Sequence, residues 1–285
     1  MNNRYDFLFI FDCQDANPNG DPDAGNLPRI DVETGQGLVT DVCLKRKIRN
    51  FVQTSRPDQL IYFKEGAVHN NQHDEAYKEI GEGSLSKEAK KKPSPEIKDK
   101  ATAWMCKNYY DVRTFGAVMS TEVNCGQVRG PVQVSFARSI DPIVSSEHAI
   151  TRTSVTKIED IQKERTMGRK FTIPYGLYKA QGFVNPFLAT QTGFDDDDLE
   201  LLFQSLENAF QFDQSAARPA GSMNPRALIV FKHDTALGAA ASHKLFDQVT
   251  ITRKPEVEVP RSFADYVVTI DETAIPAGVT LIRRI

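Results

Sequence analysis

The chain has 285 residues, 40% of them hydrophobic, and its 35 basic and 38 acidic residues give a formal net charge of −3. This length supports one sizeable core, or one core with large insertions. The net charge excludes a polycation, so a nucleic-acid site would have to come from local clustering of basic residues. No run is as long as a membrane span and no secretory pattern opens the chain, so we expect a cytoplasmic protein. The four cysteines form no CxxC pair, which indicates buried thiols, and we expect no cofactor.

The first expected element is a strand from Arg4 to Asp12, with apolar residues on both sides as in a central strand. A loop rich in Pro, Gly, Asn and Asp follows, "DANPNGDPDAGNLPR", from Asp15 to Arg29. Thr40 is then placed to cap a helix. The helical period groups the apolar residues of this helix on one side, namely Leu44, Ile48, Phe51 and Val52. It puts the basic residues Lys45, Arg46 and Arg49 on the opposite side, with Lys47 near the edge of the apolar stripe.

Residues 56–129 interrupt this strand–helix unit, and we interpret them as an insertion that carries helices. Its last part, "KATAWMCKNYYDVRTFGAVM", predicts helix. His69 and His73 are four residues apart, but the Asn, Gln and Gly around them favour a loop over a metal site on a helix face.

The second half of the chain alternates strands with one long helix. Gly130 to Ile143 predicts a half-buried strand with Val132, Val134 and Phe136 on one face. Residues 145–172 predict an extended hairpin that stands off the body, and "YGLYKAQGFVN" returns as a strand. "FDDDDLELLFQSLENAFQF" predicts a helix, "RALIVFKH" a strand, and the C-terminal forty residues short strands.

The order of these elements predicts an α+β fold. Strand, helix, insertion, strand, hairpin, strand, helix and strand follow the split βαββαβ plan of ferredoxin-like and RNA-recognition-motif folds. This plan by itself does not fix a function.

Several long segments, in the same order, resemble one known family. They are "FIFDCQDANPNGDPDAGNLPR", "GLVTDVCLKRKIRN", "DVRTFGAVMSTEVNCGQVRGPVQVSFARSIDP", "MGRKFTIPYGLYKAQGFV" and "LIVFKHD". Together they resemble the backbone subunit of type I-C Cascade, a CRISPR complex; this is the Cas-seven, or Csd-two, family of the RAMP superfamily. The resemblance covers nearly the whole chain.

The resemblance implies a hand-shaped protein that lines up in several copies along a CRISPR RNA (crRNA) and presents it for pairing with a target DNA strand. The implied palm, with a ferredoxin-like fold, comprises residues 1–55, 130–143 and 173–285; a helical fingers insertion comprises 56–129, and a β-hairpin thumb comprises 144–172. The implied partners are the CRISPR RNA, further copies of the chain, a Cas-five subunit, a large (Cas-eight) subunit and a small subunit. The Cas-three nuclease-helicase would join later.

The opening loop is the first candidate RNA site. Asn17, Asn19 and Gly20 are typical turn residues, but the amides of such a loop also suit a phosphate or ribose. Residues 44–56 hold five basic residues and no Asp or Glu. We therefore predict that Lys45, Arg46 and Arg49 contact phosphates, instead of forming an ordinary solvated face.

Two arginines, Arg113 and Arg138, are ambiguous from the sequence. Each has the chemistry of an RNA contact, and each has the chemistry of an ion pair. For Arg113 the nearby carboxylates are Asp111 and Glu122.

The expected hairpin carries the last candidate site. Arg165, Arg169 and Lys170 flank Met167, a pattern that suits gripping phosphates and wedging between bases. For Met167, packing within the hairpin is an equal alternative.

The carboxylates of the opening segment raise one alternative function. Asp12, Asp15, Asp21 and Asp23 are close in sequence, and a metal-dependent RNA endonuclease of the same superfamily would need converging carboxylates. Nothing in the turn-rich sequence fixes their convergence, so we expect a non-catalytic protein. The run "DDDDLE" at residues 195–200 is interpreted as a helix N-terminus, not as a cation site.

Overall fold

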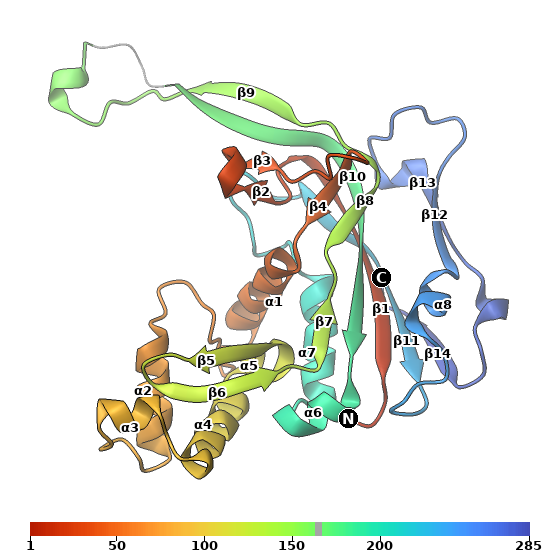
Figure 1. Cartoon of the computed structure of the whole chain (residues 1–285). Coiled ribbons are helices and arrows are strands. Elements are labelled where there is room, and N and C mark those ends of the chain that lie inside the picture. Colours follow the sequence, from red (N-terminus) through yellow and green to blue (C-terminus); the bar gives the residue numbers. More distant parts are fainter. Residues whose placement is uncertain (163–166) are drawn as a thin grey trace.

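The computed structural model describes residues 1–162 and 167–285, and it is built around one eight-stranded antiparallel sheet (Figure 1). The strands run in the order β14 (Val279–Arg283), β11 (Met223–His233), β1 (Tyr5–Ala16), β10 (Met167–Val184), β8 (Ala137–Pro142) and β4 (Gln36–Val39). β7 (Val132–Val134) and β9 (Ser146–Thr151) also pair with β10. The prediction of a central first strand is confirmed, because β1 lies between β10 and β11.

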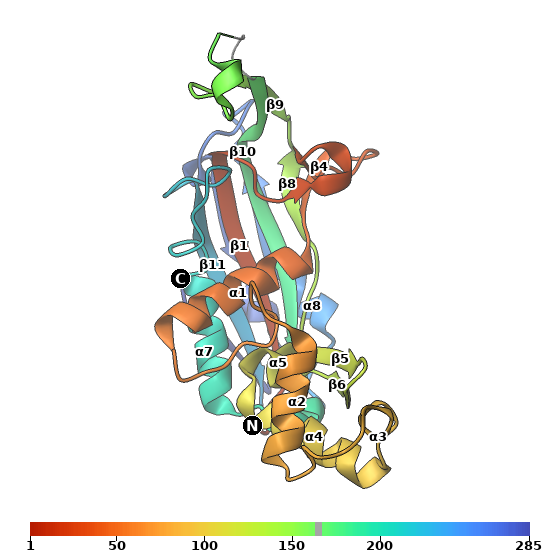
Figure 2. The same ribbon diagram turned by 90° about the vertical axis from the view of Figure 1, so that its left-hand side faces the viewer.

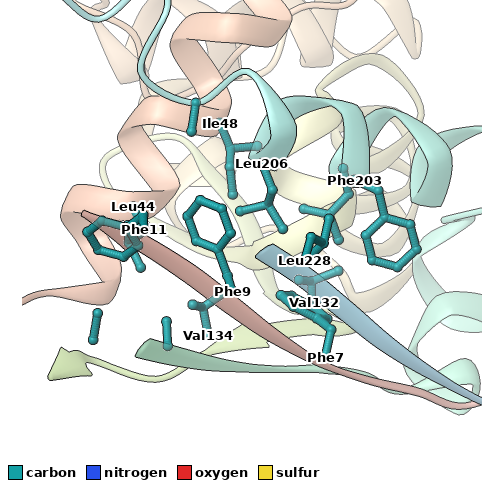
Figure 3. Packing of buried hydrophobic residues seen from close by; sticks show 14 of the residues in the cluster. Phe7, Phe9, Phe11, Leu44, Ile48, Val132, Val134, Phe203, Leu206 and Leu228 are labelled. Carbon is teal, nitrogen blue, oxygen red and sulfur yellow. The ribbon is translucent and has the colours of Figure 1, made fainter. Parts of the chain in front are cut away.

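Two helices cover one face of this sheet. They are α1 (Asp41–Ser55) and α7 (Asp196–Glu207), and Figure 2 shows both in front of the strands. Phe7, Phe9 and Phe11 point from β1 into the core beneath these helices (Figure 3). Thr40 caps α1 as predicted, since its side chain accepts a hydrogen bond from the Cys43 N–H. Burying one side of α1 in this core fixes where its basic side chains emerge.

The other face of the sheet packs against the C-terminal part of the chain. Leu8 and Ile10 contribute to a second core with α8 (Ser242–Phe246), β12 (Val249–Arg253) and β13 (Tyr266–Ile270). Short strands are therefore confirmed for the C-terminal residues. The described helices include none that is long and apolar enough to cross a membrane.

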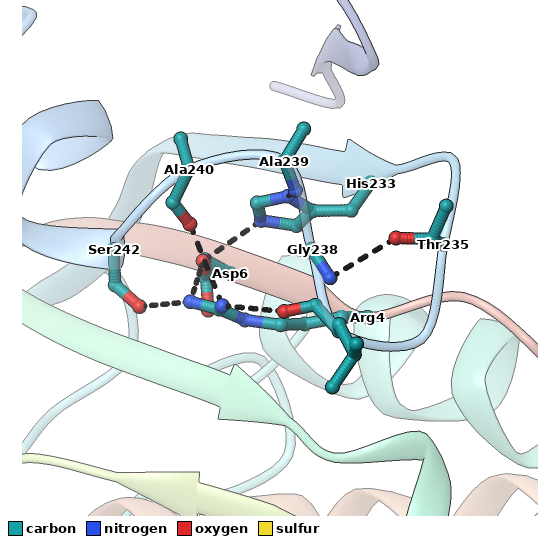
Figure 4. A network of polar contacts seen from close by, with 9 residues as sticks. Arg4, Asp6, His233, Thr235, Gly238, Ala239, Ala240 and Ser242 are labelled. Atoms are coloured by element: carbon teal, nitrogen blue, oxygen red, sulfur yellow. Dashed lines mark hydrogen bonds and ion pairs between the residues drawn. The ribbon is translucent and has the colours of Figure 1, made fainter.

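A buried polar network fixes the start of β1 to the loop that follows β11 (Figure 4). Asp6 accepts hydrogen bonds from the Arg4 guanidinium at 2.8 Å and from Nε2 of His233 at 3.0 Å. Nδ1 of His233 accepts the Ala239 N–H at 3.0 Å. This pattern places the imidazole proton on Nε2. Arg4 also contacts Ser242, so the network holds α8 against the sheet.

Residues 56–129 form a separate cluster with its own core. It contains α2 (His69–Glu79), α3 (Lys87–Lys91), α4 (Pro95–Asn108), α5 (Tyr110–Phe115) and the hairpin of β5 (Gly116–Ser120) and β6 (Asn124–Arg129). The prediction of continuous helix to Met119 is wrong, because Gly116 takes a positive φ of 81° and ends α5. The loop expected at His69 and His73 is also wrong, since both residues lie on α2.

The extended hairpin is confirmed. β9 pairs with the first residues of β10, from Thr151↔Met167 to Ser146↔Thr172, and the pair projects from the sheet (Figure 1). β10 then continues into the sheet as a single strand of 18 residues. The hairpin and the strand "YGLYKAQGFVN", expected as separate elements, therefore share one backbone, which positions the hairpin base against the sheet.

Other elements lie next to α7 and in the opening loop. The predicted helix in residues 194–212 is confirmed as α7, with α6 (Pro186–Thr192) before it. The opening loop forms a small ladder of β2 (Gly20–Asp21) and β3 (Leu27–Pro28), which lies below the hairpin in Figure 1.

Candidate nucleic-acid interface

The opening loop is held by its own asparagines. Nδ2 of Asn17 donates to the Asn26 carbonyl at 2.7 Å. Oδ1 of Asn19 accepts from the N–H and from the hydroxyl of Thr40, both at 3.0 Å. A Cβ on Gly20 would lie 3.2 Å from Asn17 Nδ2, so the ladder is tight there. None of the three takes the positive φ that favours Asn or Gly in turns, so they hold the loop through these contacts, and Asn19 in addition fixes the loop to the N-terminus of α1.

A hollow of about 840 Å³ lies where this loop, α1 and the base of the β9–β10 hairpin meet. We call it the hairpin-base hollow. Its basic lining residues are Arg29, Arg46, Arg169, Lys170 and Arg218. Among the described residues that line it, Asp41 is the one carboxylate. Asn17, Asn19 and Gly20 line it as well, so the structure gathers six of the twelve candidate RNA-binding residues in one place.

A second hollow, of about 850 Å³, lies on the other side of α1, and we call it the α1 hollow. Lys45, Arg46, Arg49 and Lys64 line it, together with Phe63, Glu65 and His69 among other residues. Val42 and Arg46 line both hollows. The two hollows therefore meet across the first turns of α1.

The basic residues of α1 are less available than their sequence predicts. Nζ of Lys45 lies 2.8 Å from Asp41, and Nε of Arg49 lies 2.7 Å from Asp111. Their side chains are 15% and 11% exposed, whereas Arg46 is 68% exposed and lies 3.6 Å from Glu65. Lys45 and Arg49 therefore do not project as free cations, because carboxylates outside residues 44–56 pair with them, and their phosphate contacts stay predictions.

Lys47 departs furthest from its expected place at the edge of the stripe. It is buried and forms an ion pair with Asp213, which also accepts from Asn50 at 2.7 Å and lies 3.6 Å from Arg218. Burial raises the pKa of Asp213, but Lys47, Asn50 and Arg218 outweigh burial and hold that pKa below its usual value.

Arg49 joins α1 to residues 56–129. Its partner Asp111 is buried and also accepts the backbone N–H groups of Tyr62 at 2.7 Å and Phe63 at 3.1 Å. The guanidinium lies 5.0 Å and 5.3 Å from the ring centroids of Phe63 and Phe115. Arg49 therefore positions the wall of the α1 hollow, and its phosphate contact remains a prediction.

Arg113 forms an ion pair, but its partner is neither Asp111 nor Glu122, the acidic residues near it in sequence. Its guanidinium binds Asp198 of α7 through two hydrogen bonds, Nε–Oδ2 at 2.8 Å and Nη2–Oδ1 at 2.7 Å. Burial lowers the pKa of Arg113, but Asp198 outweighs burial and the pKa stays above its usual value. Arg113 lines neither hollow, so of the two alternatives left open by the sequence the structure supports the internal ion pair and not the RNA contact.

Asp198 also confirms the helix-end interpretation of the four-aspartate run. Asp195 caps α7, its side chain accepting the Asp198 N–H at 2.9 Å, and the two residues form a capping box.

The remaining candidates lie on or near the hairpin. Arg138 is exposed and bonds Asp31 at 2.7 Å, which is the main reason that the pKa of Asp31 is lowered. Arg169 lies 3.2 Å from Glu147 across the hairpin, and Met167 is exposed. Arg165 lies outside the described residues.

The chain matches known proteins over most of its length. A model of the family "CRISPR-associated protein Cas7" matches residues 3–271. The chain belongs to the Cas7 family. It is similar to "CRISPR-associated protein Cas7" of Haloferax volcanii, at 27% identity over 253 residues, which is 81% of this chain and 71% of that protein.

Among solved structures, the chain is similar in fold to one in "CRISPR RNA-guided surveillance complex, pre-nicking". The TM-score is 0.52 at 16% identity, and the match covers 80% of this chain and 78% of the other. The mixed α/β fold with a large antiparallel sheet is thus shared with a chain of that complex.

The carboxylates that suggested a nuclease do not converge in this Cas7 chain. Asp12 is buried and bonds Arg226 at 2.8 Å, Tyr175 at 3.1 Å and Asn224 at 3.3 Å. Asp21 accepts the Asp23 N–H at a short 3₁₀ turn and lies 3.3 Å from Arg29. Within residues 1–162 and 167–285, no three His, Cys, Asp or Glu side chains are grouped to hold a metal ion.

His73 is likewise structural. It is buried, its Nδ1 bonds the Val123 carbonyl at 2.8 Å, and its Nε2 bonds the Tyr62 hydroxyl at 2.9 Å. Burial lowers the pKa of His73, so it stays neutral at neutral pH.

Three residues that line the hairpin-base hollow were not predicted from the sequence as site residues: Arg29, Arg218 and Phe136. Arg29 ends the opening loop, so its position beside Asn17 and Asn19 was a usable signal. Arg218 lies about two hundred residues after the opening loop in the sequence, and no local pattern indicates that the two meet. Phe136 was expected on the buried face of a strand, and it is exposed instead.

Proposed function

We propose that this chain is the crRNA-binding backbone subunit of a type I-C Cascade surveillance complex. The hairpin-base hollow carries this proposal, because five basic residues converge there from the opening loop, α1, the hairpin and the 211–222 loop. Lys and Arg that contact phosphates hold a nucleic acid without reading its sequence. This is what a guide of changing sequence requires, since base pairing reads the target.

The fold supports a division into palm, fingers and thumb. The antiparallel order β11–β1–β10–β8, with α1 and α7 on one face, is consistent with a ferredoxin-like palm in residues 1–55, 130–143 and 173–285. The separate core of residues 56–129 suits the fingers, and the projecting hairpin within 144–172 suits the thumb. RNA would then lie across α1, between fingers and thumb.

The type I-C subtype and the partners rest on the resemblance of the long sequence segments. The chain would assemble with further copies of itself along the crRNA, in the cytoplasm, and present the guide to a target DNA strand. Cas-five, large (Cas-eight) and small subunits would complete the complex, and the Cas-three nuclease-helicase would be recruited to it.

RNA-dependent assembly is the direct test. Size-exclusion chromatography of the purified chain with a CRISPR transcript is expected to give a species of several protomers on one RNA. A chain that stays monomeric with and without the transcript would contradict the proposal.

Sequence independence is a second test. Spacer RNAs of equal length and scrambled composition are expected to bind alike at fixed salt. A 100-fold preference for one spacer, or about 2.7 kcal/mol, would show sequence-specific recognition instead.

The proposal is of a structural subunit, not an enzyme. The engagement of Asp12 by Arg226 and Tyr175 supports this, since a metal ligand needs an available carboxylate. Labelled RNA is expected to stay intact when incubated with the protein, with or without Mg²⁺ or Mn²⁺. Cleavage that depends on the metal, and that Asp12→Asn abolishes, would favour the endonuclease alternative.

A further inference from the structure

The strand expected over residues 130–143 is broken by a β-bulge. β10 pairs Gly182 with Val134 and Lys179 with Arg138. Between these two pairs β10 advances by three residues, while the opposite strand advances from 134 to 138, which is four. One extra residue is therefore inserted between β7 and β8, as in a β-bulge.

The bulge turns Phe136 out of the core. Val132 and Val134 are buried before it and Ala137 and Ser139 after it, so the alternation changes phase. The Phe136 side chain is left 51% exposed. Without the extra residue it would continue the buried face of Val132 and Val134.

Hydrogen bonds show that the bulge is an ordered feature and not a frayed end. Ser135 N–H donates to the Gln181 carbonyl at 2.8 Å, and the Gln181 N–H donates to the Ser135 hydroxyl at 2.9 Å. The same hydroxyl donates to the Phe136 carbonyl at 3.0 Å. Bulges of this kind re-aim a side chain, often beside a functional site.

Phe136 lies between two basic hollows. It lines the hairpin-base hollow, and it also lines a third hollow of about 450 Å³, which we call the sheet-edge hollow. Arg138 and Lys179 line the sheet-edge hollow, and none of the described residues that line it is Asp or Glu; the carboxylate of Asp31 bonds Arg138 from outside the lining. Ile150 and Phe171 add an apolar wall on the hairpin side.

We propose that Phe136 is a base-stacking residue for single-stranded RNA, placed where the strand passes the hairpin base. This rests on the proposed function. An aromatic ring flanked by cations on both sides suits a nucleotide, with the base on the ring and the phosphates on the basic residues. Stacking tolerates any base, which agrees with a guide of changing sequence. A protein partner would instead need carboxylates to meet the two basic hollows.

The test compares Phe136→Ala with Phe187→Ala, using a short single-stranded RNA that one protomer can hold. Phe187 is 53% exposed on α6 and lines none of the three hollows, so it is a matched control. Phe136→Ala is expected to weaken RNA binding about tenfold, or about 1.4 kcal/mol, which is within the range for one stacked base. The slope of log K against log salt should not change, because no phosphate contact is lost. Phe187→Ala should bind as the wild type does.

Two further measurements make the test specific for stacking. Phe136→Trp should keep the affinity, and its added fluorescence should be quenched by RNA but not by the same oligomer without bases. The loss in Phe136→Ala should also vanish with the abasic oligomer.

The outcomes separate the two proposals. A wild type that binds no RNA overturns both. A wild type that binds RNA with Phe136→Ala at equal affinity overturns the stacking role alone. If Phe136→Ala changes self-association without RNA and leaves RNA affinity intact, the ring contacts another copy of the chain and stacking is wrong.

Discussion

The basic residues of this protein fall into two groups with opposite surroundings. In one group, Lys47 and Arg113 are buried and Arg49 of α1 is half-buried. They form ion pairs with Asp213, Asp198 and Asp111, respectively. At the hairpin-base hollow, Arg46 and Arg169 are largely exposed, and their contacts with carboxylates are at or near the surface. The same side-chain chemistry therefore serves internal ion pairs in one region and a candidate phosphate track in the other.

This difference shows why a run of basic residues is weak evidence for a nucleic-acid site. Residues 44–56 contain no acidic residue, yet two of their cations have carboxylate partners 62 and 166 residues away. Removing one partner of a buried ion pair leaves a buried charge without compensation and lowers stability strongly. Removing an exposed cation costs little, because water solvates the charge that remains. Stability and RNA binding should therefore respond to different arginines.

Arg113→Ala should have the largest effect. It leaves the Asp198 carboxylate buried without its cation, which we expect to cost about 3–5 kcal/mol of unfolding free energy. Urea unfolding followed by circular dichroism measures this. Arg46→Ala is the control, and it should stay within about 0.5 kcal/mol of the wild type. Equal stabilities for the two variants would remove the distinction between buried and exposed cations.

Arg46→Ala with Lys170→Ala should act on RNA instead. If each side chain contacts one phosphate, the slope of log K against log salt should flatten by about 1.4 for single-stranded RNA. Salt titration of a fluorescent RNA oligomer measures the slope. Lys98→Ala with Lys100→Ala is the matched control, because these lysines lie on α4 and line neither the hairpin-base hollow nor the α1 hollow. An unchanged slope in the first double variant would show that the hollow does not hold phosphates.

Local patterns predicted the elements of the fold but not its ion pairs. The alternation of β1, the Thr40 cap, the stripe of α1 and the Asp195 helix start all depend on neighbouring residues, and all are confirmed. The Arg113–Asp198 pair joins residues 85 apart, and it depends on how α5 and α7 meet in the folded chain. Charge counted along a helix cannot report such a partner.

The bulge at Phe136 shows the same limit for a strand. The sequence alternates without a break through Val132, Val134 and Phe136, so a period of two predicts that all three lie on one face of the strand. Only the pairing with β10 reveals the extra residue. Candidate residues in the opening loop were predictable because they are close in sequence, whereas Arg218 and Phe136 required the assembled sheet.

Acid should weaken the buried Lys47–Asp213 ion pair. The folded-state pKa of Asp213 is lowered, so its contribution to stability is complete above its unfolded pKa and is lost as pH falls through the folded value. Unfolding free energy should therefore decrease below about pH 4, the usual range of an aspartate. Asp213→Asn should reduce stability at neutral pH and flatten this acid-dependent decrease in urea unfolding measured across that range. A wild-type slope retained in Asp213→Asn would assign the acid sensitivity to other carboxylates.

Asp196→Asn with Asp197→Asn should have the smallest effect on stability. It tests whether exposed charges beside a buried ion pair matter for stability or for RNA binding. Both aspartates are exposed in the first turn of α7, while their neighbour Asp198 is buried with Arg113. Their negative charges favour the positive end of the helix dipole, so neutralising them should cost at most about 1 kcal/mol of unfolding free energy. The capping box should persist, because it uses Asp195 and Asp198.

RNA binding and its salt slope should match the wild type, since neither Asp196 nor Asp197 lines the hairpin-base hollow or the α1 hollow. Loss of RNA binding with the fold preserved would mean that the four-aspartate run has a role beyond the helix end, and that exposure alone does not separate structural from functional charges in this chain.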